Sequence, residues 1–254
     1  MANDRLRDAL MEAGLTPAAL ADKLGVSPKT AERWVTSARA PFPRFRHQIA
    51  ALVHQSEAYL WPAALSAQRQ AEISESEVLR IYPYRASVPA ELWARLFESA
   101  TEEIGILVYS GFFLPEQHAP QLALLPAKAA AGVRVRILLG DPDCAQVAAR
   151  GQEEEIGEAM ASKIRNVLTA YYRPYSQVPG ISIRLHCTTL YNSIFVFDDE
   201  MLVNTHAYGV PAAFAPTLHL RRLSSGTLFQ TYASSFNRVW DQTATAWPPR
   251  EDAA

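Results

Sequence analysis

The start of this 254-residue chain is constrained most by two short pairs, Thr16-Pro17 and Ser27-Pro28, in each of which a hydroxyl-bearing residue precedes proline. Thr16 and Ser27 can each accept a backbone N–H as the N-cap of a helix, and the prolines after them suit the first helical position. Gly25 lies between the two pairs, where glycine favours the end of a helix. The spacing therefore predicts two short helices joined by a tight turn.

Apolar periodicity supports these helices and adds one before them. Apolar residues recur at helical spacing from Leu6 and predict a helix over about residues 4–13, which stops at Gly14. In the helix after Ser27, the inward positions are Ala31, Trp34 and Val35. The outward positions of that helix are polar and long: Lys29, Thr30, Glu32 and Arg33.

Two short helices joined by a glycine-containing turn can present the second helix to the major groove of DNA. Helix N-termini attract phosphate, while Lys and Arg reach guanine or phosphate, Glu accepts from cytosine, and Thr contacts a thymine methyl. Five basic residues and one acid lie between Ser27 and His47. The predicted DNA-binding residues are Thr16, Pro17, Ser27, Pro28, Lys29, Thr30, Glu32, Arg33, Arg39 and Arg44.

The segment LTPAALADKLGVSPKTAERWVTSARAPFPRFRHQIAALV resembles the helix-turn-helix of the Cro/repressor class, also called the xenobiotic-response-element (XRE) class of bacterial transcription regulators. The resemblance covers about residues 4–60 and implies a five-helix DNA-binding domain over residues 1–62, with further helices near 46–54 and 56–60. It places Lys29, Thr30, Glu32 and Arg33 at base-facing positions. Pro28 departs from the pattern because proline cannot donate a hydrogen bond there. A bundle used for protein docking is the alternative.

Composition favours a globular protein with sizeable cores, since 49% of the residues are hydrophobic and 20% are charged. No apolar run approaches the ~18 residues of a spanning helix, and the first residues are charged, unlike a signal peptide. We therefore expect a cytoplasmic, nucleoid-associated protein that does not enter a membrane. The two cysteines, Cys144 and Cys187, are expected to be reduced packing residues, although a redox pair is the alternative.

A polar Ser/Glu-rich run near residues 70–77 suggests a boundary, so residues 63–77 are predicted to be a short helix and linker. Beyond it, strand-like and helix-like patterns alternate, which predicts an α/β domain over 78–243 with a mixed or parallel sheet flanked by helices. A flexible tail is predicted over 244–254. The predicted strands are 79–84, 104–113, 133–141, 181–187, 191–199, 200–208 and 218–223, and the predicted helical segments are 89–101, 115–132, 153–171 and 228–242.

This second region lacks the familiar enzyme signatures. It contains no G-x-x-x-x-G-K-[ST], G-x-G-x-x-G, G-x-S-x-G or H-E-x-x-H motif, so nucleotide-binding, hydrolase-elbow and zinc-protease chemistry have no support. His186, His206 and Asp198 match no standard metal-ligand spacing. We expect no metal and no cofactor.

The stretch LHCTTLYNSIFVFDDEMLVNTHAYG, with GFFLPEQHAPQLALLPAKAAAGVRVRILLGD ahead of it, resembles the phospholipase D-like fold. That resemblance implies an H-x-K-x-x-x-x-D motif with a nucleophilic histidine and a phosphate-binding lysine. If Asp198 takes the family Asp position, Tyr191 falls on the histidine, Ser193 on the lysine and Thr205 on the small residue that follows. The chain resembles still more the uncharacterised C-terminal domains of many bacterial regulators with this helix-turn-helix. A catalytically degenerate domain is therefore expected, with no catalytic residues.

The polar residues that remain of such a site have two possible roles. They supply hydrogen-bond donors and acceptors for a ligand, or they are a structural remnant whose polar groups satisfy strand ends and loop backbones. The candidate pocket residues are His186, Tyr191, Asn192, Ser193, Asp198, Asn204, Thr205 and His206.

The leading interpretation is a sequence-specific transcription regulator that binds double-stranded DNA as a homodimer and senses a small phosphorylated or nucleotide-like effector. Trp93, Phe97 or the helix around Phe236 to Trp240 are candidates for the dimer interface or for the core. The alternatives are a phosphodiesterase or nuclease with a rearranged active site, and an interaction module.

Overall fold

A computed structural model describes residues 3–37, 40–62, 76–223, 226–242 and 244–248. The chain forms two compact units. Unit 1 contains residues 1–77 and 222–231, and unit 2 contains residues 78–221 and 232–254. The predicted linker lies largely outside the described residues. Each unit is considered by itself.

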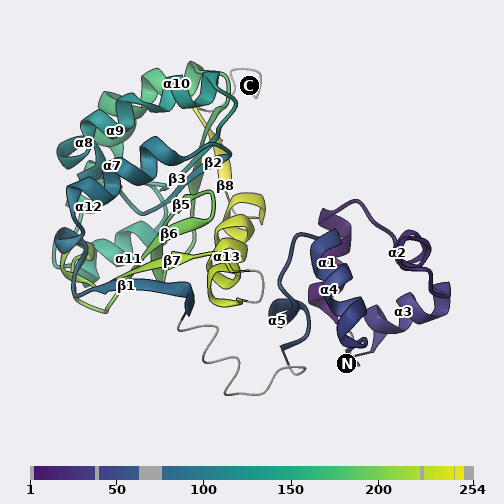
Figure 1. Cartoon of the computed structure of the whole chain (residues 1–254). Helices are drawn as coiled ribbons and strands as arrows, with labels where there is room; N and C mark the ends of the chain where they lie inside the picture. Colours follow the sequence, from purple (N-terminus) through teal and green to yellow (C-terminus); the bar gives the residue numbers. More distant parts are fainter. Residues whose placement is uncertain (1–2, 38–39, 63–75, 224–225, 243, 249–254) are drawn as a thin grey trace, which may run out of the picture. The chain divides into compact units, whose positions relative to one another are not determined.

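The N-terminal part of unit 1 is helical (Figure 1). Its elements are α1 (Asp4–Glu12), α2 (Pro17–Leu24), α3 (Pro28–Thr36), α4 (Pro43–Leu52) and α5 (Glu57–Leu60). Thr16 and Ser27 are the N-caps of α2 and α3, and Gly25 ends α2 in the left-handed conformation at φ 64°. The predicted N-caps Thr16 and Ser27 and the predicted helix end at Gly25 agree with the structure, because each depends on neighbouring residues of the chain. The helix expected near 46–54 instead covers residues 43–52.

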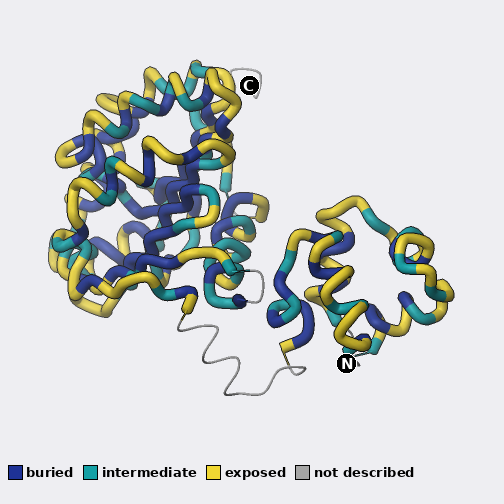
Figure 2. The backbone as a smooth tube through the Cα atoms, in the orientation of Figure 1, coloured by how far each residue is buried: buried dark blue, intermediate teal, exposed yellow. Residues whose placement is uncertain are grey.

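The core of unit 1 gathers the apolar face of each helix. Leu6, Leu20, Ala31 and Ile49 have no exposed surface, and Trp34 packs its ring 5.5 Å from that of Phe45. Figure 2 shows the alternation of buried and exposed turns that such amphipathic helices produce. Burial of each large side chain contributes about 1.5–3 kcal/mol, which short helices require because they are marginal alone.

Unit 2 is a mixed α/β structure built on an eight-stranded sheet in the order β1-β7-β6-β5-β2-β3-β4-β8 (Figure 1). The neighbours β2–β3 and β3–β4 are parallel, and the other pairs are antiparallel. The predicted mixed sheet is thereby confirmed. The strands are β1 (Val78–Tyr82), β2 (Glu103–Leu107), β3 (Arg134–Gly140), β4 (Ile181–His186), β5 (Asn192–Phe197), β6 (Glu200–Thr205), β7 (Thr217–Arg221) and β8 (Ala244–Trp247).

Helices connect and cover these strands. They are α7 (Ala90–Ser99), α8 (Phe113–Gln117), α9 (Ala119–Ala123), α10 (Leu125–Ala130), α11 (Ala145–Glu153), α12 (Ala159–Val167) and α13 (Leu228–Gln242). Three short 3₁₀ helices, η2 (Arg85–Ser87), η4 (Arg173–Gln177) and η5 (Ala212–Phe214), and one π-helix, η3 (Leu168–Tyr172), complete them. The single helix predicted over 115–132 is divided into α8, α9 and α10. Pro120 and Pro126 lie in the first turns of α9 and α10, because proline cannot continue a helix.

The helix predicted over 153–171 is also wrong in extent. Residues 145–153 already form α11, and α12 begins only at Ala159. Glu155 and Gly157 adopt left-handed φ values of 57° and 49° between them. Such a backbone cannot be helical, and so the chain turns there.

The two faces of the sheet are covered by different helices. On one face, Phe195 of β5 contacts Trp93 of α7 and Phe113 of α8, with ring centroids 5.0 and 5.7 Å apart. On the other face, a Cβ at Gly105 would lie 3.0 Å from the ring of Phe236 in α13. Both faces are therefore buried, as the apolar runs of the strands require.

Three further findings bear on the predictions. Residues 244–247, predicted to be tail, form β8 and pair with β4, because the edge of β4 offers free backbone groups. Trp93, Phe97, Phe236 and Trp240 are buried in the core of unit 2, which agrees with the second of the two alternatives given for them. Residues 222–231 belong to unit 1, where buried Glu77 accepts hydrogen bonds from the N–H groups of residues 227–229. No described helix has the length and hydropathy needed to cross a membrane.

Candidate functional site

Polar side chains of α3 lie on its outward face. Lys29, Glu32 and Arg33 are exposed, while Ala31, Trp34 and Val35 on the opposite face are buried. Within the described part of the chain, none of the three exposed side chains forms an ion pair. Their charged groups therefore remain available to a partner.

The other predicted residues of this surface have internal roles. Thr16 Oγ1 accepts from the Ala19 N–H at 3.1 Å, and Ser27 Oγ accepts from the Thr30 N–H at 3.3 Å. Thr30 Oγ1 also lies 2.8 Å from Ser27 Oγ, which ties the predicted base-facing Thr30 to the cap. The hydroxyls of this surface are thus already used by the helix ends.

The remaining predicted positions are two prolines and two arginines. Pro17 is half-buried and Pro28 is exposed, each at the start of its helix. Arg44 is exposed and its guanidinium lies 4.5 Å from the centre of the Phe45 ring. Arg39 lies outside the described residues.

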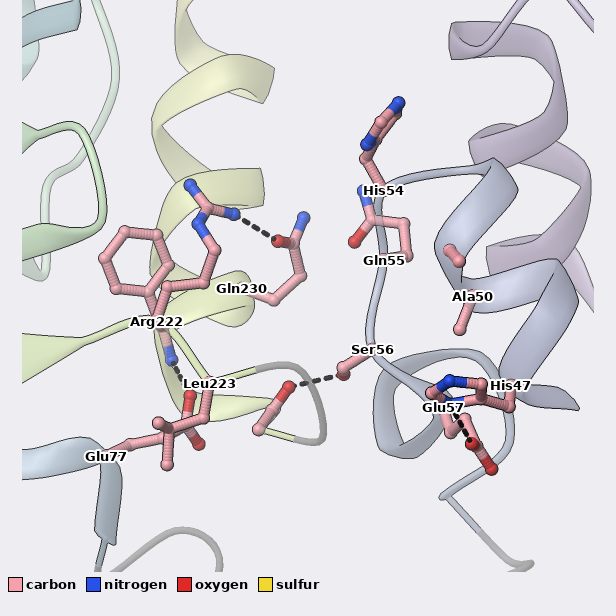
Figure 3. Close-up of a pocket in the computed structure, with 13 residues that line it drawn as sticks. His47, Ala50, His54, Gln55, Ser56, Glu57, Glu77, Arg222, Leu223 and Gln230 are labelled. Atoms are coloured by element: carbon pink, nitrogen blue, oxygen red, sulfur yellow. Dashed lines mark hydrogen bonds and ion pairs between the residues drawn. The ribbon is translucent and has the colours of Figure 1, made fainter. Parts of the chain in front are cut away.

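A hollow of about 350 Å³ lies elsewhere in unit 1 (Figure 3). Residues far apart in the sequence line it, including His47 and Ser56 beside Arg222 and Gln230. Ser56 Oγ donates to the Gly226 carbonyl, and Arg222 donates to the Gln230 side chain at 3.4 Å. Sequence reasoning did not find this hollow, because contacts between residues so distant in the chain leave no local pattern.

In unit 2, two of the predicted pocket residues come together in one cavity. Ser193 on β5 and His206 just after β6 line a cavity of about 240 Å³. The antiparallel register that pairs Ser193 with Asn204 brings His206 alongside. Ser193 Oγ lies 3.0 Å from His206 Nε2.

The hydrogen bonds of His206 define the proton positions on its ring. Nδ1 lies 3.2 Å from the carbonyl oxygen of Leu190, which can only accept, so Nδ1 carries the proton of the neutral ring. Nε2 is then the acceptor and the Ser193 hydroxyl donates to it. Burial, followed by the charge of Arg150, lowers the pKa of His206 to about 4, so the ring is neutral near pH 7.

The cavity also contains residues that sequence reasoning missed. Arg85 lies there with its guanidinium 3.5 Å from the centre of the Phe113 ring, and burial lowers the pKa of this arginine to about 10. Lys163 lines the cavity from α12. Tyr109 stacks on His206 with centroids 5.8 Å apart, and its hydroxyl accepts from the Leu190 N–H. No motif links these positions, and only the fold collects them.

Asp198 lies away from the cavity, at the turn between β5 and β6. Its carboxylate accepts from the N–H groups of Thr101, Glu102 and Glu103 and from the Thr101 hydroxyl, at 2.7–3.1 Å. Burial raises the pKa of Asp198, but these hydrogen bonds outweigh it and the net pKa is lowered. Asp198 is therefore a structural cap for β2, and its predicted place in the pocket is wrong.

Other predicted pocket residues also bond within the fold. His186 is buried, with Nε2 3.1 Å from the Val108 carbonyl and Nδ1 accepting from the Thr188 N–H, and burial lowers its pKa to about 4. Asn204 donates to the carbonyls of Ala215 and Pro216, and Thr205 also bonds Pro216. These three residues do not line the cavity because their polar atoms serve strand ends.

The last two predicted residues flank the cavity without lining it. Tyr191 is 77% exposed, and Asn192 is half-buried opposite Thr205. Over the described residues, no group of three His, Cys, Asp or Glu side chains is arranged to hold a metal ion. Only Ser193 and His206 of the predicted set thus share the cavity.

No known protein family and no curated protein matches this chain. Solved structures with similarity to it include TrmBL2, an archaeal chromatin protein with a novel mode of DNA binding (TM-score 0.43, 13% identity, 73% of this chain and 59% of that one). Another is the phospholipase D family member Nuc from Salmonella typhimurium (TM-score 0.35, 17% identity, 62% of this chain and 89% of that one). A third is phosphatidylserine synthase from Haemophilus influenzae (TM-score 0.44, 17% identity, 65% of this chain and 39% of that one). The chain spans less than two thirds of TrmBL2.

Proposed function

We propose that α2 and α3 form a helix-turn-helix and that this protein is a sequence-specific, DNA-binding transcription regulator. The observation that carries the proposal is the outward face of α3, where exposed Lys29, Glu32 and Arg33 have no ion-pair partner among the described residues. Charged groups left unpaired on a helix of this kind are suited to base edges and phosphates in the major groove. Because the Thr30 hydroxyl is already bonded to Ser27, we expect Thr30 to contact a thymine methyl group and not to form a hydrogen bond to a base.

The regulator is proposed to act as a homodimer on a palindromic site. One short recognition helix buries little DNA surface, and a second copy raises the effective affinity. The cavity of unit 2 is the proposed effector site, and its cationic groups Arg85 and Lys163 favour a small phosphorylated or nucleotide-like molecule.

The test of DNA binding is selection of bound fragments from genomic DNA by the full chain, followed by fluorescence anisotropy at several salt concentrations. The best site should be palindromic and bound at least about a thousandfold more tightly than random DNA. Lys29→Ala should lower the salt slope by about one if Lys29 contacts a phosphate. Arg7→Ala is the matched control, because Arg7 is an exposed arginine on α1 already paired with Asp4. Binding without sequence preference would contradict the proposal.

A second candidate function is a phosphodiesterase or nuclease with a rearranged active site. The hydrogen bond from Ser193 to His206 favours it, since a serine bonded to a neutral histidine is a common arrangement of covalent catalysis. Hydrolysis of bis(p-nitrophenyl) phosphate by the full chain, with loss of turnover in His206→Ala, is the test. His186→Ala is not expected to identify a catalytic group, because His186 lies outside the cavity.

A further inference from the structure

The Ser193 hydroxyl lies in a defined orientation. It is nearly buried, lines the cavity from β5, and donates to His206 Nε2 at 3.0 Å. The Leu190 carbonyl holds the other ring nitrogen of His206 and so fixes which nitrogen can accept a proton. This backbone carbonyl takes the orienting place that a carboxylate holds in a Ser-His-Asp triad.

We propose that Ser193 is a nucleophile toward a phosphate ester bound in this cavity and that His206 is its general base. The inference rests on the second candidate function and does not depend on DNA binding. It differs from a histidine nucleophile, because the position matched to that histidine is Tyr191, which is exposed and does not line the cavity.

The chemistry balances with the groups present. Ser193 Oγ attacks phosphorus while its proton passes to His206 Nε2, and the bond from phosphorus to the leaving oxygen breaks. The leaving alkoxide takes the proton from Nε2, which leaves a phosphoserine ester and a neutral imidazole. A water molecule then gives its proton to Nε2 and attacks phosphorus, the bond to Oγ breaks, and Oγ recovers that proton from Nε2.

The charges around the cavity favour an anionic ester over a neutral one. Arg85 stays charged near pH 7, and no carboxylate of the described residues forms an ion pair with it. Two carboxylates, Glu116 and Glu154, also line the cavity; Glu154 is bonded to Arg150 at 2.7 Å, and Glu116 is exposed to solvent. Arg85 and Lys163 can therefore neutralise the oxygens of a bound phosphate.

The experiment treats the full chain with a fluorophosphonate probe, which phosphonylates activated serines, and locates the adduct by intact-protein and peptide mass spectrometry. We expect one adduct on Ser193, none on that residue in Ser193→Ala, and labelling about a hundredfold slower in His206→Gln. Ser162→Ala is the matched control, because Ser162 is exposed on α12 and does not line the cavity, and it should label like the wild type. Thermal unfolding of each variant checks folding, and Ser193→Ala tests the step even if His206→Gln does not fold.

The outcomes separate this inference from the function on which it rests. Hydrolysis of bis(p-nitrophenyl) phosphate that survives Ser193→Ala would keep a phosphodiesterase and overturn the serine nucleophile. Absence of both adduct and hydrolysis in the wild type would overturn both. An adduct that forms equally well in His206→Gln would overturn the role of His206.

A pH profile gives a readout that a merely structural histidine would not produce. The groups near His206 are Arg150 and Glu153 of α11, Arg85 of η2, and the ring of Tyr109. With the His206 pKa lowered to about 4, adduct formation at pH 5.5 should match that at pH 7 within about twofold. With a base of ordinary histidine pKa, the rate of adduct formation would fall about tenfold from pH 7 to pH 5.5, and such a fall would contradict the assignment.

Discussion

The polar residues of α3 and those of the β5–β6 hairpin differ in what they bond to. On α3, Lys29, Glu32 and Arg33 are exposed and make no described ion pair. In the hairpin, Ser193 and Asn204 are buried and hydrogen-bonded within unit 2. A substitution on α3 should therefore change binding and leave stability almost intact, whereas one in the hairpin should change stability unless the residue faces the cavity.

The largest expected effect is on the stability of unit 2. Asn204→Leu removes the donor that serves two carbonyls, those of Ala215 and Pro216, and should lower the free energy of unfolding by about 3 kcal/mol. Urea unfolding followed by circular dichroism measures it. Asn192→Leu is the matched control on β5, since Asn192 is only half-buried, and it should cost less than about 1 kcal/mol. Equal losses in the two variants would contradict the hydrogen-bond explanation.

The next effect belongs to α3 and should appear in DNA affinity alone. Arg33→Ala should weaken binding to the selected site by about 1–3 kcal/mol if Arg33 contacts a base, with little effect on random DNA. Its unfolding free energy should stay within about 0.5 kcal/mol of the wild type, because the side chain is exposed. If Arg7→Ala weakened binding as much, the recognition surface would not be α3.

A smaller effect depends on pH. Asp198→Asn keeps a residue that tolerates the φ of 52° found at this position. It removes the charge of the carboxylate that accepts four hydrogen bonds, and should therefore lower the free energy of unfolding by about 1–2 kcal/mol near pH 7. Because the folded-state pKa of Asp198 is lowered, its contribution is present above the ordinary value of 3.8 and is lost as pH falls through the folded pKa.

The stability difference between wild type and Asp198→Asn should therefore shrink in acid, as measured by urea unfolding from pH 7 to pH 3. Glu98→Gln, at an exposed position on α7, is the control and should show almost no difference at either pH. A difference that stays constant down to pH 3 would mean that the carboxylate charge is not what stabilises the turn.

The smallest expected effect tests the exposed position beside the cavity. Tyr191→Phe should change neither the unfolding free energy nor DNA affinity without effector by more than about 0.5 kcal/mol, because the hydroxyl lies on a 77% exposed side chain. Parallel urea and anisotropy titrations measure both. A large loss in either would show that Tyr191 has a role that its exposure does not indicate.

The sequence by itself determined the helices of unit 1 and the presence of a mixed sheet in unit 2. Caps such as Thr16 and Ser27, and the buried face of α3, follow from residues within a few positions of one another. The same local signals were insufficient in residues 115–132, where the prolines divide the predicted helix into three.

Only the tertiary structure decided which polar residues meet. Strand pairing places Ser193 beside His206, turns Asp198 toward Thr101, and adds β8 to the edge of β4. Arg85 and Lys163 reach the same cavity from elements far away in the chain. Such contacts depend on the register and order of strands, which are set by the packing of the whole unit and leave no periodic pattern in any one segment.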